Sequence, residues 1–302
     1  MIIFDNLSIS TIRSGKGDCI HLRFVGVSGN THNIIIDSGP TSTAGEFRNL
    51  IRTILAKSEK LDCLIISHYD DDHIGGILKV GDHGFQDIYF NAYSEAEETE
   101  NLSAIKNQRL FHSLPSTKVH SSVLAGDRIV IDGAEIVIHA PTKESLARAM
   151  VKMQDADVQL SAISDWGKPF DELMEEQYPS SDTSIANQAS IVFSFEYQAT
   201  RLLFCGDAWA DSIPSGKFDI VKLPHHGSIR NISDELLSGI DTKMFLICAD
   251  GTSHPNKKTI AKLLRKYGSI TVYCNYSWWV NGFLLKEDMK YIENGSLSLR
   301  NT

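Results

Sequence analysis

The densest group of chemically active side chains is His68-Tyr69-Asp70-Asp71-Asp72-His73, which supplies two imidazoles and three carboxylates within six residues. The group directly follows the apolar run Cys63–Ile66, which predicts a buried strand. Charged groups at the end of such a strand must be paired or bound to metal where they are buried. Imidazole and carboxylate together suit zinc, iron or manganese, so the segment predicts a metal site. A solvated acidic turn is the alternative interpretation.

Two further groups of ligand-type residues follow apolar strands later in the chain. Asp207 comes after the run Leu202–Gly206, and the pair His225-His226 comes after the run Ile220–Pro224. Either group alone is weak evidence, because Gly-Asp and His-His pairs are common in turns. Three groups at three strand ends predict one assembled site, since loops at one edge of a sheet are where sites are built.

Short apolar strands alternate with helical segments, which favours an α/β fold with two mixed sheets packed together and helices on the outer faces. Segments 46–59 and 256–267 have the apolar spacing of amphipathic helices. We expect one domain over residues 1–302, with more polar helical insertions near 92–112 and 142–186. The predicted strands are 7–13, 18–25, 33–37, 63–67, 128–132, 135–139, 189–197, 201–205, 219–223, 244–249, 270–274 and 278–286.

The composition is that of an ordinary globular protein, with 42 % hydrophobic and 22 % charged residues. No apolar run approaches the roughly 20 residues that span a bilayer, and no signal peptide is recognisable. The net charge of −9 argues against a protein that coats nucleic acid. The five cysteines show no Cys-x-x-Cys spacing, which favours buried free thiols in a reducing compartment. We therefore expect a cytoplasmic protein without a membrane partner.

The motifs resemble the metallo-β-lactamase superfamily, whose signature is His-x-His-x-Asp-His, a later Gly-Asp and a final histidine. Within it the chain is most similar to the hydrolase domain of the ComEC/Rec2 competence proteins and to phosphorylcholine esterases. Those proteins carry His-x-Asp-x-Asp-His-Ile-Gly-Gly and Lys-x-Pro-His-His-Gly-Ser, matched here by 68–76 and 222–228. Segments 15–18, 34–39, 126–141 and 187–192 extend the resemblance. The histidine of the family's third motif is absent, and Asn187 lies near its place.

This resemblance implies the αββα sandwich of the family and two divalent metal ions, zinc or manganese. His68 and Asp70 would hold one ion, Asp72, His73 and one histidine of the 225–226 pair the other, and Asp207 would bridge them. The sequence does not order His225 and His226; we assign His225 as the ligand and His226, with Asp72, as catalytic. The residues expected to support the ligands or contact substrate are Asp37, Asn187, Lys222, Ser228 and His254.

The function expected from the resemblance is a metal-dependent hydrolase, specifically a phosphodiesterase or nuclease that uses a hydroxide bridging two metals. Such a centre suits in-line displacement at phosphorus, because the two ions clamp the attacking and leaving oxygens. The expected substrate is a short single-stranded nucleic acid or a small phosphodiester. The alternatives are a lactone, thioester or ester hydrolase on the same fold, and a non-catalytic binding module that has kept a metal.

Overall fold

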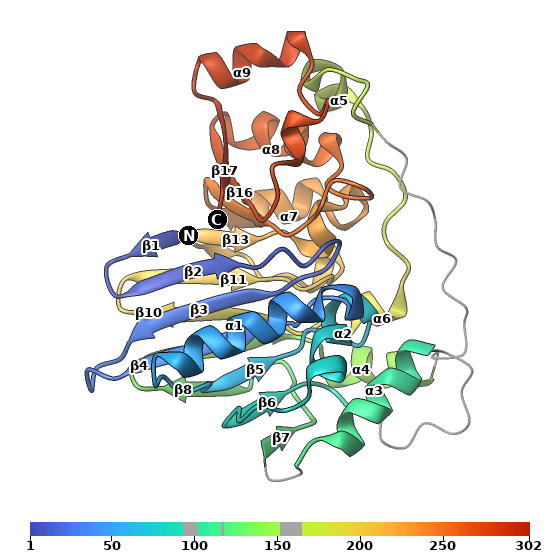
Figure 1. The fold of residues 1–302 in the computed structure, drawn as a ribbon. Coiled ribbons are helices and arrows are strands. Elements are labelled where there is room, and N and C mark those ends of the chain that lie inside the picture. Colours follow the sequence, from blue (N-terminus) through green and yellow to red (C-terminus); the bar gives the residue numbers. More distant parts are fainter. Residues whose placement is uncertain (93–101, 116–117, 152–164) are drawn as a thin grey trace.

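The computed structural model describes residues 1–92, 102–115, 118–151 and 165–302, and two large sheets dominate it (Figure 1). The first sheet has the strand order β1-β2-β3-β4-β5-β6-β7. Its strands are antiparallel from β1 to β4 and parallel from β4 to β7. The strands are β1 (Ile2–Phe4), β2 (Leu7–Thr11), β3 (Ile20–Val25), β4 (Thr31–Ile36), β5 (Cys63–Ile65), β6 (Asp87–Tyr89) and β7 (Val119–His120).

The second sheet has the order β17-β16-β15-β13-β11-β10-β9-β8. It is antiparallel from β8 to β11 and parallel from β11 to β17. Its strands are β8 (Arg128–Ile131), β9 (Ala134–Ala140), β10 (Val192–Tyr197), β11 (Thr200–Phe204), β13 (Ile220–Lys222), β15 (Met244–Ile247), β16 (Ile270–Cys274) and β17 (Leu297–Asn301). The short strands β12 (Gly216–Lys217) and β14 (Ile240–Asp241) pair with each other.

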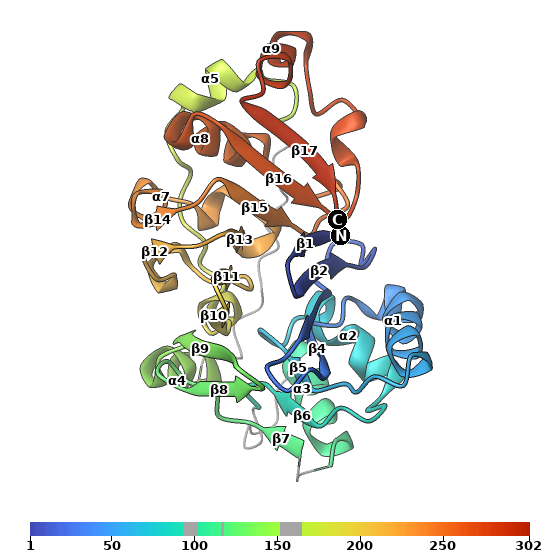
Figure 2. The same cartoon turned by 90° about the vertical axis from the view of Figure 1, so that its left-hand side faces the viewer.

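Helices cover the outer faces of both sheets, as Figure 2 shows for α1 beside the first sheet and α8 beside the second. In α1, Phe47, Ile51 and Ile54 repeat at helical spacing and are buried against the sheet. The helices are α1 (Ala44–Ala56), α2 (Asp71–Val80), α3 (Leu102–Ser113), α4 (Lys143–Val151), α5 (Phe170–Glu175), α6 (Ile185–Gln188), α7 (Asp234–Gly239), α8 (Lys257–Tyr267) and α9 (Met289–Glu293). Short 3-10 helices are η1 (Thr41–Thr43), η3 (Ala210–Ser212), η4 (Pro224–Gly227), η5 (Ile229–Asn231), η6 (Trp278–Val280) and η7 (Lys286–Asp288).

Three apolar layers hold these elements together. Ile34 and Ile36 of β4 point into the layer between the sheets, where they join Phe193 of β10 and other buried side chains. Ile35 points the other way, into the layer beneath α1 and α2. The third layer lies between the second sheet and the helices α5, α7 and α8. A strand buried on both faces reads as a continuous apolar run, which explains the sequence Ile34-Ile35-Ile36. The expected αββα sandwich is confirmed.

One predicted strand is wrong. Residues 278–286 form η6 and a following turn, not a strand, because the ring of Trp278 turns inward and packs against Trp166 and Phe283. The strands β1, β6, β7, β12, β14 and β17 have no counterpart in the prediction. All five cysteines lie among the described residues, and each is buried and free as expected.

The two segments predicted as helical insertions contain helices. Segment 92–112 holds most of α3, and segment 142–186 holds α4, α5 and the beginning of α6. Residues 93–101 and 152–164 of these segments lie outside the described part of the chain. That the segments are insertions in a single domain stays a prediction. None of the helices in the described ranges combines the length and apolar character that crossing a bilayer requires.

Candidate metal centre

The loops that bear the predicted ligands leave the ends of neighbouring parallel strands. β4 and β5 end just before Asp37 and His68, and β11 and β13 end just before Asp207 and the pair His225–His226. Parallel neighbours present their carboxyl ends at one edge of a sheet, so each pair of strands brings its two loops together. β3 runs antiparallel to β4, and Asp18, which precedes β3, therefore lies at the same edge.

The helix α2 begins inside the ligand motif and places Asp72 and His73 in its first turn. The partial positive charge at a helix N-terminus favours carboxylates there. Close backbone approaches fix this turn, and they require glycine. A Cβ on Gly76 would lie 2.1 Å from the carbonyl oxygen of Ser38, and one on Gly17 would lie 1.9 Å from that of Asp72. A larger residue at either position would displace α2 and the ligands that it bears.

Asp207 and three side chains near it form one set of ligand atoms. The Nε2 atoms of His226 and His73 lie 3.4 and 3.5 Å from Oδ2 of Asp207. Asp72 lies on their other side, with its oxygens 3.3 Å from His226 Nε2 and 3.8 Å from His73 Nε2. Ligands that share one ion at about 2.1 Å lie roughly 3 to 4 Å apart. Asp72, His73 and His226 therefore have the spacing of a single metal site, and Asp207 forms another such group with His68 and His73.

A second, more open set adjoins the first through the same oxygen of Asp207. His68 Nε2 lies 3.6 Å from Asp70 Oδ2 and 4.0 Å from Asp207 Oδ2. His225 Nε2 lies 3.8 Å from that oxygen. Asp207 is thus adjacent to both sets, the position expected of a bridging ligand.

The chemistry of these donors fits divalent metal. Seven buried polar side-chain atoms among the described residues have no hydrogen-bond partner, and five of them belong to this cluster. A buried polar atom without a partner is costly, so such a concentration needs an explanation. The five atoms are Nε2 of His68, His73 and His226, Oδ1 of Asp70 and Oδ1 of Asp207. A cation bound between them would satisfy nitrogen lone pairs and carboxylate oxygens together.

Each of the buried histidines is oriented by a group behind its ring. His73 Nδ1 lies 2.9 Å from Asp37 Oδ2, and His226 Nδ1 lies 3.1 Å from Asp18 Oδ1 and 2.9 Å from the carbonyl oxygen of Cys248. His68 Nδ1 lies 3.1 Å from the hydroxyl of Ser67, which itself bonds Asp37. Acceptors at Nδ1 leave the Nε2 lone pair directed at the centre, the arrangement typical of metal-binding histidines. Asp37 therefore lies where a supporting residue was expected.

The remaining predicted residues lie around the centre in different ways. Lys222 is buried and forms an ion pair with Asp18 and a hydrogen bond of 3.3 Å to the carbonyl oxygen of Gly206, so it supports the loops and has no open path to substrate. Ser228 is buried too, and its hydroxyl accepts a hydrogen bond from the backbone of Arg230 as a helix cap. His254 packs its ring 5.1 Å from that of His225.

Asn187 lies behind His225 rather than beside a metal position. Its Nδ2 donates to Asp182 Oδ2 over 2.7 Å, and the same carboxylate lies 3.3 Å from His225 Nδ1. Asn231 completes the group, with Oδ1 3.0 Å from His225 Nδ1. Asn187 Nδ2 itself lies 3.3 Å from His225 Nδ1, so this amide contacts a histidine of the pair.

The electrostatics of the cluster favour positive charge at its centre. Burial alone would raise the pKa of Asp207, but His226, His73 and His225 lower it well below the usual range. Burial would likewise lower the pKa of His73 and of His226, and the surrounding carboxylates, Asp207 foremost, raise both well above the usual range. The same surroundings that stabilise protonated imidazoles stabilise a metal cation. His254 differs, because burial and the neighbouring histidines lower its pKa to about 3.

Comparison with known proteins identifies the family. Residues 24–238 match the model of the metallo-beta-lactamase superfamily, a span that contains every candidate ligand. The chain belongs to the metallo-β-lactamase superfamily. It is therefore a metal-dependent hydrolase by family.

Individual relatives of this superfamily member are distant. The chain is 25 % identical over 286 residues to ComE operon protein 3 of Bacillus subtilis (strain 168), an alignment that covers 85 % of this chain and 30 % of that protein. The chain thus spans less than a third of the length of this relative. The match agrees with the resemblance to competence proteins.

Solved structures are similar along nearly the whole chain at low identity. The metallo-beta-lactamase fold protein YhfI from Bacillus subtilis has a TM-score of 0.49 and 8 % identity, covering 99 % of this chain and 97 % of its own. Zn²⁺-bound PqqB from Methylobacterium extorquens has a TM-score of 0.49 and 9 % identity, with 96 % of each chain covered. The family assignment rests on the sequence match and not on these two structures.

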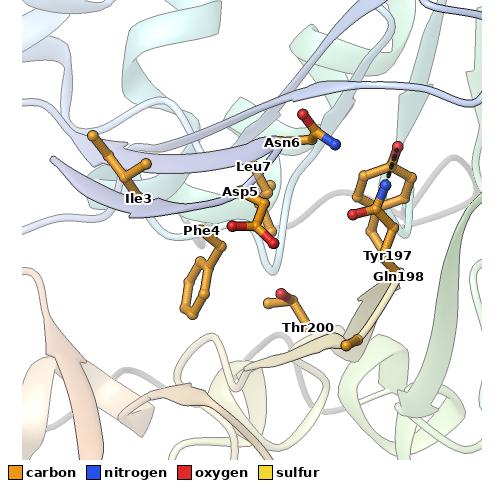
Figure 3. Close-up of a pocket in the computed structure, with 9 residues that line it drawn as sticks. Ile3, Phe4, Asp5, Asn6, Leu7, Tyr197, Gln198 and Thr200 are labelled. Atoms are coloured by element: carbon orange, nitrogen blue, oxygen red, sulfur yellow. Dashed lines mark hydrogen bonds between the residues drawn. The ribbon is translucent and has the colours of Figure 1, made fainter.

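A depression of about 630 Å³ lies elsewhere, between the β1–β2 turn and the β10–β11 turn (Figure 3). Asp5 is the one carboxylate among its lining residues, and the hydroxyl of Tyr197 is already bonded to the carbonyl oxygen of Val25. No histidine lines it. Its residues offer no convergent catalytic groups, and the metal centre is the better candidate for the functional site.

Proposed function

We propose that the protein is a phosphodiesterase that holds two divalent metal ions around Asp207. One ion would be held by Asp72, His73, His226 and Asp207, and the other by His68, Asp70 and Asp207. The observation that supports this best is the group of five buried atoms without hydrogen-bond partners, all of which belong to the ligand-type side chains of this cluster.

Within the histidine pair, the geometry favours the reverse of the sequence-based assignment. His226 Nε2 lies within 3.4 Å of both Asp72 and Asp207, whereas the close contact of His225 Nε2 is to Asp207 alone, at 3.8 Å. We therefore take His226 as the ligand. The role of His225 is argued separately below.

Two bound divalent ions would supply an activated water and neutralise charge on the phosphoryl oxygens. Residues of the chain orient the ligands and balance their charge. Asp37 and Asp18 fix the rings of His73 and His226, which keeps their Nε2 atoms directed at the centre. Lys222 balances part of the negative charge of the buried carboxylates through its ion pair with Asp18.

A short substrate fits the accessibility and charge of the site. The side chains of Asp70 and Asp72 are 26 % and 32 % exposed, whereas those of His68, His73 and His226 are buried. The centre is therefore open on its carboxylate side. With a net charge of −9, the chain offers little attraction to a long polyanion. These features support a small phosphodiester or a short single strand as the substrate.

The experiment that tests the proposal is hydrolysis of bis(p-nitrophenyl) phosphate by protein loaded with manganese or zinc. We expect metal-dependent turnover that a chelator removes, together with cleavage of a short single-stranded oligonucleotide. A lactone and a β-lactam serve as comparison substrates and should remain intact. Lactone cleavage without phosphodiester cleavage under both metals would refute the proposal and favour an ester hydrolase. Metal binding without any turnover would favour a binding module.

A further inference from the structure

His225 and His226 are adjacent in the chain but have different surroundings. The side chain of His226 is 3 % exposed, and that of His225 is 27 % exposed. Among the described residues, His226 belongs to two of the compact groups of three ligand atoms that could hold an ion, and His225 belongs to none. His225 is thus the histidine of the centre that a bound substrate can reach.

The backbone directs the two rings apart. Both residues adopt left-handed conformations, with φ of 46° at His225 and 54° at His226. Residues other than glycine rarely adopt this left-handed backbone region. Backbone strain of this kind is concentrated at functional sites. The result is a pair of rings whose planes are inclined by 71° to each other, with centroids 6.0 Å apart. Adjacent histidines can therefore serve different partners.

A polar group holds the ring of His225 from behind. Its Nδ1 lies 3.0 Å from Asn231 Oδ1 and 3.3 Å from Asp182 Oδ2. Asp182 is itself fixed by donors from three sides: Asn187 Nδ2 at 2.7 Å, Asn231 Nδ2 at 2.9 Å and the backbone N–H of Ser184 at 2.9 Å. The amide nitrogen of Asn187 also lies 3.3 Å from Nδ1, so polar groups surround this edge of the ring and fix its orientation. Nε2, on the other edge, is turned towards Asp207, 3.8 Å away.

We propose that His225 contacts the phosphoryl group of the substrate rather than a metal ion, and that Asp182 is the positioning residue that aims its Nε2 at that group. The inference rests on the metal centre of the proposed function. The ring of His254 packs beside that of His225, with their centroids 5.1 Å apart. Asp182, Asn187 and Asn231 thus do for a substrate-binding histidine what Asp37 and Asp18 do for the metal-binding ones.

Metal content and phosphate binding test the role of His225 without an assay of turnover. The probe is inorganic phosphate, titrated calorimetrically into metal-loaded protein whose metal content is measured by elemental analysis. We expect His225→Ala to keep both metal equivalents and to bind phosphate roughly tenfold or more weakly, the effect of losing a hydrogen bond to a charged group. His226→Ala is the matched comparison and should lose metal. Loss of a metal equivalent from His225→Ala, or unchanged phosphate affinity, would overturn the proposal.

A double-mutant cycle tests whether Asp182 acts through His225. Asp182→Asn should lower kcat/KM for bis(p-nitrophenyl) phosphate by roughly 10- to 100-fold, the usual effect of removing such a supporting group, with metal content unchanged. In the His225→Ala background the same change should have no further effect, because the group that it positions is gone. Asp211→Asn, an exposed carboxylate of η3, is the control and should behave like wild type. Additive losses in the double variant would refute the positioning role.

The two proposals can fail separately. If the wild-type protein cleaves no phosphodiester, the proposed function fails, and the metal content and phosphate affinity of the variants still decide the role of His225. If His225→Ala releases a metal ion from an active phosphodiesterase, the proposed function stands and this inference fails.

Discussion

Replacing Asp207 with asparagine should remove both metal ions, whereas replacing Asp72 should remove one. Oδ2 of Asp207 lies within 4.0 Å of ligand nitrogens from both sets, and Asp72 adjoins only the set of His73 and His226. At a free metal concentration of 100 times Kd, each site stabilises the fold by about 2.7 kcal/mol. A chain of this size gains about 2 °C in midpoint per kcal/mol. Loading with metal should therefore raise Tm by about 10 °C in the wild type, about 5 °C in Asp72→Asn and scarcely at all in Asp207→Asn.

The measurement is a thermal melt of each variant with metal and after chelation, paired with elemental analysis. Asp71→Asn is the matched control, because Asp71 lies between two proposed ligands in sequence yet turns to Lys106 and Thr41. It should keep the full metal-dependent rise. Two metal equivalents in Asp207→Asn, or an equal loss in Asp72→Asn and Asp207→Asn, would refute a shared ligand.

Three other outcomes are expected. The more open set of ligands should bind its ion more weakly, and its oxygen-rich character should favour manganese over zinc in restoring activity; calorimetry that finds two equal zinc sites would contradict this. His32 lies between Asp62 and Asp132, at 2.7 and 2.8 Å, and these partners raise its pKa against the effect of burial. The stabilising contribution of His32 should be complete below pH 6.5 and lost as pH rises through the folded-state pKa. The difference in free energy of unfolding between wild type and His32→Gln, measured in urea, should therefore shrink from pH 6 to pH 9. A constant difference would exclude the charged pairing. Asp288→Asn should lower the free energy of unfolding by about 3–5 kcal/mol, because Lys257 would keep a buried charge without its partner at 2.6 Å; a loss below about 1 kcal/mol in urea denaturation would contradict that.

Much of the fold could be predicted from local sequence patterns. The predictions that were wrong or missing have a physical cause. Continuous apolar runs such as Ile34–Ile36 could be recognised as strands because both faces are buried. Residues 278–286 are also rich in apolar side chains, but Asn281-Gly282 interrupts them, and Trp278 is buried within a 3-10 turn by contacts with Trp166, more than 100 residues earlier in the chain. The Asn-Gly pair is a turn signal, whereas the aromatic partner that buries Trp278 could not be found locally. Strands of two or three residues, such as β7 and β12, are too short to show a period.

The predicted ligands lie together, but the groups that orient them could not be found from spacing. Asp18 was recognisable only as part of a family-like segment, and Asp182 lies in a polar stretch that reads as surface. Both carboxylates lie against ring nitrogens of histidines, Asp18 buried and Asp182 partly buried. The order of His225 and His226 depends on two left-handed backbone conformations, which residue type does not specify. The groups that orient the ligands are far from them in sequence, so only the folded structure brings them into contact.

The contact between Asp18 and His226 spans 208 residues and has a consequence for how the protein is made. At a synthesis rate of 5–20 residues per second, Asp18 leaves the ribosome roughly 10 to 40 s before its partner. During that time the first sheet can form, but it holds only His68, Asp70, Asp72 and His73. The nascent chain therefore presents only part of the ligand set. Its affinity for a metal ion should be lower than that of the complete protein. Tight and selective metal binding should begin only when the second sheet packs against the first. Metal binding would then indicate that both ligand-bearing parts of the chain have been synthesised and folded.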